Sequence, residues 1–288
     1  MASIKELRIR IKSLKNTNKI TAAMKLVATS KLKKSQDAMK ANKPYSDKLD
    51  EVLGRISNSS DLTNPLLEAR EVKKVRIYAF TSDKGLCGSF NNGLIKYARN
   101  TLPQQFKGKE IEVLTLGKRA KDFFSKNTEY FTHDFEGITK SPNFADIAPI
   151  AEQCIQDFLD GKIDEVHLLF NEFESVLVQN PMTKLILPIE ANNIENEEGT
   201  TSFDYIYEPD GKALLDTILP NYVAIQFFQG LLENAAGEHG ARMNAMENAT
   251  KNSKELINDL TLVMNRARQA QITTELTEIV SGAESLKG

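Results

Sequence analysis

The 288-residue chain has no tryptophan, two cysteines and three histidines. Cys87 and Cys154 lie far apart, which fits neither a disulfide framework nor a metal-binding pair. This cysteine usage predicts a reducing cytoplasm as the compartment of the protein. The histidines at 133, 167 and 239 fall in separate segments and indicate no metal cluster, so each is expected to be a surface or packing residue.

Long apolar runs are also missing. No segment approaches the ~18–20 apolar residues that a membrane-spanning helix needs. The opening stretch, "MASIKELRIRIKSLKN", alternates charged residues with Ile and Leu, so it lacks the apolar core of a signal peptide.

Sequence motifs for catalysis are absent as well. There is no G-x-x-x-x-G-K-[ST] phosphate loop and no G-x-S-x-G nucleophile elbow. "DKGLCGSFN" (83–91) follows a predicted strand, but Gly85 and Gly88 match neither the phosphate-loop nor the dinucleotide spacing. A tight strand-to-helix turn is the better interpretation, with Cys87 as a small turn residue rather than a nucleophile. We therefore predict no catalytic, cofactor or metal site in this chain.

The net charge of −2 conceals an asymmetry. Residues 1–43 carry twelve Lys or Arg and two acids, which is +10 and leaves −12 for the remainder. A basic segment on an acidic protein indicates a polyanionic partner, and nucleic acid is one candidate. The basic residues at positions 5, 8, 12, 15 and 19 form one stripe, but the others point around the predicted helix, and no aromatic residue precedes Tyr45. An acidic protein surface fits at least as well, so both alternatives stay open on composition alone.

The first segment, 4–56, has the pattern of a long helix. Its apolar residues follow the 3,4 spacing of a coiled-coil seam at both ends, whereas the stripe between them is thin. Pro44 is expected to bend this helix or to begin a new one. The seam residues are Ile4, Leu7, Ile11 and Leu14, then Ile20, Met24, Val27 and Leu32, and finally Tyr45, Leu49, Val52 and Ile56.

The helical pattern returns from 211 to the end, where Pro220 suggests one helix from about 221 to 286. Two long helices around a central insert predict an antiparallel coiled coil, in which the second overhangs the first by about a dozen to two dozen residues. Small residues at 235–237 and 240–241 are expected to let the two helices approach closely. The heptad frame is Leu215, Ile218, Tyr222, Ile225, Leu232, Ala236, Met243, Met246, Ile257, Leu260, Met264 and Ala267, slipping by one position to Ile272, Leu276, Ile279 and Ala283.

Between the helices, strand and helix patterns alternate. Strands are predicted at 73–82 and 111–117, helices at 91–102 and 143–161, and a terminal strand pair at 164–173 and 183–190. The alternation predicts a Rossmann-like α/β domain with a partly parallel sheet. The fold class is therefore α/β with a long antiparallel coiled coil, divided into 1–57 and 211–288 as coiled-coil helices and 58–210 as the α/β domain.

Four stretches match a known family. They are "NTNKITAAMKLVATSKLKKSQ" (16–36), "TSDKGLCGSFN" (81–91), "FDYIYEPD" (203–210), and "EHGARMNAMENATKNS" with "NRARQAQITTELTEIVSGAESL" (238–253, 265–286). They occur in the family's order, and the chain resembles the gamma subunit of F-type ATP synthases over essentially its full length.

The resemblance implies a central rotor stalk that couples proton flow through a membrane ring to ATP synthesis or hydrolysis. Its implied partners are three alpha and three beta subunits, the epsilon subunit and the c-ring, with no nucleic acid. It also implies that this subunit has no active site or cofactor of its own, and that partners hold it at the cytoplasmic face of a bacterial plasma membrane.

The resemblance assigns roles to particular residues. One set is expected to meet the alpha and beta subunits, and another to meet the membrane ring and epsilon. The first comprises Met24, Lys25, Lys84, Leu86, Cys87, Arg242, Arg266, Arg268, Gln269, Thr273 and Glu275, and the second Tyr205, Tyr207 and Glu208.

Overall fold

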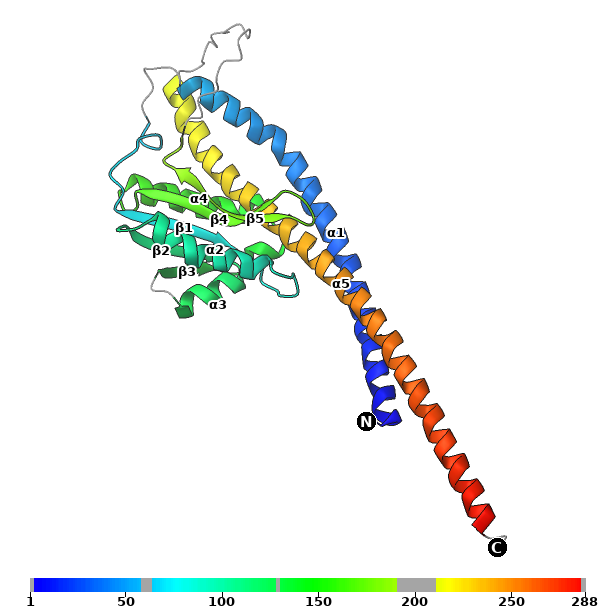
Figure 1. The fold of residues 1–288 in the computed structure, drawn as a ribbon. Coiled ribbons are helices and arrows are strands. Elements are labelled where there is room, and N and C mark those ends of the chain that lie inside the picture. Colours follow the sequence, from blue (N-terminus) through cyan, green and yellow to red (C-terminus); the bar gives the residue numbers. More distant parts are fainter. Residues whose placement is uncertain (1–2, 58–63, 128–129, 191–210, 286–288) are drawn as a thin grey trace, which may run out of the picture. The chain divides into compact units, whose positions relative to one another are not determined.

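The computed structural model describes residues 3–57, 64–127, 130–190 and 211–285. The chain forms two compact units, each described separately below. The helical unit comprises Met1–Ala28 and Met243–Gly288, and the α/β unit comprises Thr29–Arg242. Figure 1 labels the two long helices, α1 (Ile4–Ser57) and α5 (Gly211–Ser285). Each contributes residues to both units.

Both long helices continue through a proline. Pro44 lies inside α1, which excludes the expectation that a new helix begins there. Pro220 lies inside α5, so the predicted start near 221 is wrong by ten residues. The buried Leu215, Leu219 and Val223 surround Pro220 in the sequence. Packing of these side chains offsets the backbone hydrogen bond that proline removes.

The buried seam of α1 differs from the predicted one in its middle and at Tyr45, which was expected in the seam but is 54% exposed. Ile20 and Val27 were expected in the seam, but they are 59% and 58% exposed. The strict 4,3 spacing instead continues from Leu14 through small and polar residues, which an apolar pattern does not detect. These positions, buried or half-buried, are Asn18, Thr21, Lys25, Ala28, Leu32, Ser35, Met39, Asn42 and Ser46, followed by Leu49 and Leu53.

The α/β unit contains a five-stranded sheet with strand order β3-β2-β1-β4-β5. Among the described strands, β3, β2, β1 and β4 pair parallel, and β4 pairs antiparallel with β5, so the predicted terminal strand pair is present and the sheet is partly parallel, as expected. This confirms the Rossmann-like α/β architecture. The strands are β1 (Lys74–Phe80), β2 (Glu110–Leu116), β3 (Phe131–Phe135), β4 (Glu165–Phe173) and β5 (Gln179–Leu187).

Helices cover both faces of the sheet. α2 (Phe90–Gln105) and α3 (Lys118–Asn127) pack on one face, where the buried cluster includes Ile77, Leu94 and Phe124. α4 (Phe144–Leu159) and α5 pack on the other, and a 3-10 turn, η1 (Ile138–Lys140), precedes α4. The inner strands β1, β2 and β4 therefore bury both faces over most of their length, which explains their near-continuous apolar sequences.

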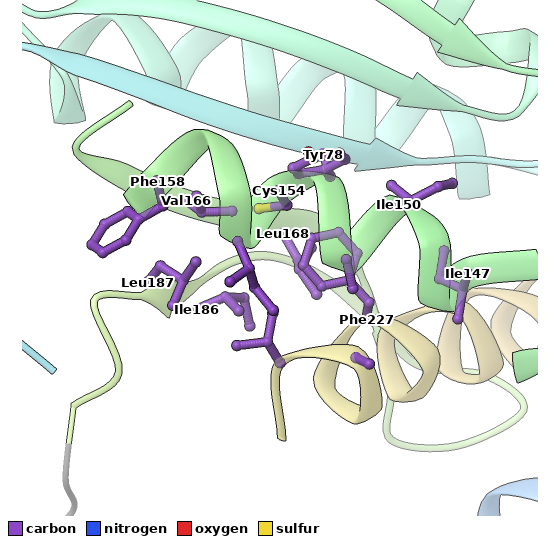
Figure 2. Close-up of a cluster of buried hydrophobic side chains, with 14 of the residues drawn as sticks. Tyr78, Ile147, Ile150, Cys154, Phe158, Val166, Leu168, Ile186, Leu187 and Phe227 are labelled. Carbon is purple, nitrogen blue, oxygen red and sulfur yellow. The ribbon is translucent and has the colours of Figure 1, made fainter. Parts of the chain in front are cut away.

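The core between the sheet, α4 and α5 is drawn in Figure 2. Tyr78 of β1 meets Phe227 of α5 edge to face, with ring centroids 4.8 Å apart. Cys154 of α4 is fully buried in this cluster, and burial raises the pKa of its thiol to about 12. Cys154 is therefore a packing residue, and α5 is part of the core of the α/β unit.

Candidate functional site

The last part of α5 has no covering element in the described structure. In the helical unit, Ile257, Leu260 and Met264 are half-buried, whereas every residue from 268 to 285 is exposed. At 1.5 Å per residue this end is about 27 Å long. Figure 1 shows it extending past the amino-terminal end of α1. We call residues 268–285 the free end; its length agrees with the predicted overhang.

The free end has two chemically different faces. Helix periodicity places Ile272, Leu276 and Ile279 on one stripe, and these side chains are 48%, 57% and 67% exposed. The same periodicity places Arg268 on one border of the stripe and Gln269 on the other. An apolar stripe with polar borders and no intramolecular cover is the usual composition of a protein-binding surface.

Polar groups of the free end bond mainly along the helix. The Thr273 hydroxyl donates to the Gln269 carbonyl at 2.9 Å, and the Gln271 side-chain amide donates to Glu275 at 2.8 Å. Arg266 and Arg268 are exposed, and neither forms a salt bridge within the described part of the chain. Both guanidinium groups thus remain available to a partner.

A polar layer joins α1 and α5 in the helical unit. The Thr250 hydroxyl donates to the Thr21 hydroxyl at 2.7 Å, and the Asn18 amide donates to the Thr250 carbonyl at 2.7 Å. Lys25 forms a 2.8 Å salt bridge with Glu247. Lys25, predicted as a contact for an acidic partner, is therefore already paired, whereas its neighbour Met24 is half-buried.

The turn between β1 and α2, which we call the β1 turn, is held by many hydrogen bonds. Asn91 at the start of α2 donates to the Ser82 hydroxyl at 2.7 Å and to the Cys87 sulfur at 3.1 Å. Cys87 is 2% exposed, so it cannot present its side chain to a partner in this conformation. Leu86 is instead 64% exposed, with a left-handed φ of 63°. Lys84 is also exposed.

The same turn caps α3. The Thr81 hydroxyl accepts from the Ala120 amide at 2.9 Å, and the Asp83 carboxylate accepts from the Lys118 amide at 3.1 Å. Gly117 adopts a φ of 112°, and a Cβ there would lie 2.3 Å from the Thr81 carbonyl oxygen. The β1 turn and the β2–α3 connection thus fit together only with glycine at this position.

Arg242 of α5 reaches this turn. Its guanidinium pairs with Glu238 at 2.6 Å and donates to the carbonyl oxygens of Lys84 and Gly85, each at 3.2 Å. His239 lies beside it, with Nδ1 3.3 Å from the Arg242 guanidinium. Burial, and then the positive charges of Arg242 and Lys31, lower the pKa of His239 to about 4.

The predicted contact residues therefore lie in three places. The structure brings Arg242 together with Lys84, Leu86 and Cys87 in the α/β unit. Met24 and Lys25 lie at the polar layer of the helical unit, and the remaining positions lie at or next to the free end (Arg266, Arg268, Gln269, Thr273 and Glu275). Tyr205, Tyr207 and Glu208 lie outside the described residues.

Sequence reasoning named Arg242 only as a contact for other subunits, and it missed the other groups that hold the β1 turn. Glu238 and Arg242 are four residues apart on a helix, which is the spacing of a favourable ion pair, so this pair had a detectable signal. Asn91 and Ser82 had none, because their side chains meet only after the strand and helix have packed. Within the described residues, no helix is apolar and long enough to cross a membrane, and no group of three or more His, Cys, Asp or Glu could hold a metal ion.

Residues 3–286 match the ATP synthase family ATP-synt. The ATP synthase gamma chain of Pelotomaculum thermopropionicum is 42% identical over 288 residues, covering all of both chains. That of Geobacter metallireducens is 43% identical over 290 residues, again with both chains fully covered.

Solved structures share the fold. The Euglena gracilis mitochondrial ATP synthase rotor superimposes with a TM-score of 0.65 at 17% identity, covering 93% of this chain and 98% of that one. The Tetrahymena thermophila central stalk and c-ring structure gives a TM-score of 0.59 at 23% identity, covering 80% and 99%. On the full-length sequence matches, this chain belongs to the ATP synthase gamma chain family.

Proposed function

We propose that this chain is the central rotor stalk of an F-type ATP synthase, and that it works by turning inside a ring of three alpha and three beta subunits. Family membership carries the assignment to the ATP synthase, and the free end of α5 carries the mechanical role. About five helical turns of exposed helix carry an apolar stripe, Arg268 on its border and Arg266 just before it, and neither arginine forms a salt bridge within the described residues. Such a segment requires a surrounding partner.

Rotation places opposing demands on this surface. The apolar stripe (Ile272, Leu276 and Ile279) favours enclosure in a dry sleeve, because exposing these side chains costs roughly 25 cal/mol per Å². The polar borders, with Arg268 and Gln269, supply hydrogen bonds that can be exchanged between neighbouring subunits. A contact that is small and partly polar can be broken and remade, whereas a large apolar interface would lock the rotor in place.

The helix pair would transmit torque. In the helical unit, the Thr21–Thr250 hydrogen bond and the Lys25–Glu247 salt bridge tie α1 to α5. These ties resist sliding of one helix on the other in a seam that has few large apolar side chains. Twist applied to either helix then reaches the other.

The finer assignments follow from this role. Nucleotide chemistry would belong to the alpha and beta subunits, and this chain would supply only the changing surface that sets their conformations. Tyr205, Tyr207 and Glu208 would meet the c-ring and epsilon, and these partners would hold the protein at the cytoplasmic face of the membrane. We also propose that the division into 1–57, 58–210 and 211–288 reflects shaft and foot. The likenesses give no support to a nucleic-acid scaffold, which we do not retain.

The test is reconstitution with the catalytic subunits. Purified chain, mixed with alpha and beta subunits, should form one complex and rotate a rod attached to the α/β unit when ATP is added. Arg268→Glu should weaken the complex, since a charge-assisted hydrogen bond contributes about 1.5–3 kcal/mol when shielded from solvent. Lys254→Glu, at an exposed position earlier on α5, is the matched control. A chain that binds DNA and fails to recruit the nucleotide-binding subunits would contradict the assignment.

A further inference from the structure

Arg242 turns inward rather than toward solvent. Its side chain is 11% exposed, and its guanidinium connects α5 to the β1 turn. One nitrogen pairs with Glu238 at 2.6 Å, while another donates to the carbonyls of Lys84 and Gly85 at 3.2 Å. A planar guanidinium can bond to Glu238 and to the turn carbonyls at the same time, because its N–H donors point in different, fixed directions.

The turn that Arg242 holds contains a strained residue. Leu86 has a φ of 63°, a left-handed conformation that costs a non-glycine residue roughly 1–2 kcal/mol. Its side chain nevertheless gains little from burial, because it is 64% exposed. Strained residues persist where the surroundings fix them, and they concentrate at sites with a functional role.

Two anchors fix the two parts of the turn. Asn91 bonds to Ser82 and Cys87, so it holds the start of the turn and the residue after Leu86. The carbonyls just before Leu86 are those that accept from Arg242, and the Lys84 carbonyl also accepts from the Ser82 hydroxyl at 2.7 Å. Leu86 is thus presented outward by an anchor on each side, one of which comes from α5.

We propose that Arg242 is a positioning residue that holds Leu86 outward for contact with the alpha and beta subunits, rather than a residue that touches those subunits itself. This inference rests on the proposed function, because it takes the ring as the partner. The recognised surface would be an apolar depression bordered by carboxylates, which complements an exposed leucine two residues from the exposed ammonium of Lys84.

A double-mutant cycle in the reconstituted complex tests the proposal. Leu86→Ala should raise by about tenfold the concentration of chain that gives half-maximal ATPase with alpha and beta subunits. Arg242→Lys keeps a cation for Glu238, but a lysine has one nitrogen and cannot replace the two guanidinium nitrogens, one of which pairs with Glu238 while the other donates to the carbonyls. Arg242→Lys should raise the half-maximal concentration by a similar or smaller factor than Leu86→Ala. The double variant should need no higher concentration than Leu86→Ala alone.

Hydrogen exchange in the isolated full chain gives an independent readout. Arg242→Lys should speed amide exchange across 83–89 by about tenfold and leave the sheet unchanged, because one anchor of the turn is lost. Arg99→Lys, at an exposed position on α2, is the matched control and should change neither readout. This measurement does not require assembly, so it remains decisive if a variant fails to join the complex.

The outcomes distinguish a failure of the Arg242 proposal from a failure of the proposed function. If the effects of Leu86→Ala and Arg242→Lys multiply, or if exchange across the turn does not change, Arg242 acts by another route and the proposal is wrong. If the unmodified chain forms no complex with alpha and beta subunits, the proposed function fails instead, while the exchange result still reports whether Arg242 holds the turn.

Discussion

Substitution of glycine by alanine should change the stability of the protein in opposite directions at two positions of α5. A Cβ at Gly237 would lie 2.8 Å from Cε2 of Phe90 and 3.3 Å from Cγ of Gln179. A Cβ at Gly240 would meet Phe173 and Val176 at 3.5 Å, which is ordinary contact. Phe90 begins α2 directly after the β1 turn and is 4% exposed, so its ring has little room to move.

The magnitudes follow from these distances. Gly→Ala in a helix interior stabilises by about 1 kcal/mol, and this gain is common to both sites. Overpacking of a buried ring costs about 1–3 kcal/mol, and only Gly237→Ala incurs it. Gly240→Ala should therefore be more stable than Gly237→Ala by about 1–3 kcal/mol, whatever the shared gain.

Urea unfolding of both variants, followed by far-UV circular dichroism, measures this difference directly. Because the change in helix propensity is the same in both variants, the difference between their free energies of unfolding reports the close approach of α5 to Phe90. Equal stability of the two variants would refute the packing that we describe. Greater stability of Gly237→Ala would refute it more strongly.

Two further predictions concern charge and ligand. His239 has a folded pKa of about 4, below its ordinary 6.5, so the folded state binds fewer protons and stability is lost as pH falls from 6.5 toward 4. This lowering of the His239 pKa corresponds to at most about 3 kcal/mol of stability. In His239→Gln, the free energy of unfolding in urea should therefore depend less on pH between 6.5 and 4. An unchanged pH dependence would contradict the cause that we assign to the pKa shift. The isolated chain should bind ATP too weakly to detect by calorimetry, because the β1 turn lacks the spacing of a phosphate loop; micromolar binding would contradict our interpretation of Gly85 and Gly88.

The sequence predicted the strands and long helices because their periodicities are strong. All twelve residues of the predicted α5 frame from Leu215 to Ala267 are buried or half-buried. The stripe at Ile272, Leu276 and Ile279 was recognised as a shift of that frame, and these residues are exposed. β3 was missed, since it is a five-residue edge strand that contains the polar sequence Thr-His-Asp.

Other errors arose because local pattern does not reveal the partner of a side chain. Gly237 and Gly240 were expected to bring the two long helices together, but their near neighbours are Phe90, Gln179, Phe173 and Val176 of the α/β unit. The α1 seam was misplaced because Asn18 and Thr21 are polar, and their burial and their hydrogen bonds with Thr250 identify them as seam residues only in the structure. The predicted roles of the contact residues toward other subunits stay predictions.

The most direct test of the rotor mechanism is Asn252→Pro, in the helical unit. Asn252 is exposed and lies within α5, so proline removes one helix hydrogen bond and clashes with the preceding turn at roughly 3 kcal/mol, with no core side chain lost. ATP-driven proton pumping per ATP hydrolysed is measured in inverted vesicles with normal subunit stoichiometry, and Asn252→Ala is the control. We predict that the proline variant loses more pumping than ATPase, because a kinked shaft absorbs twist, while the alanine variant is close to neutral. Equal pumping per ATP in the two variants would contradict a stiff transmitting helix and with it the rotor mechanism.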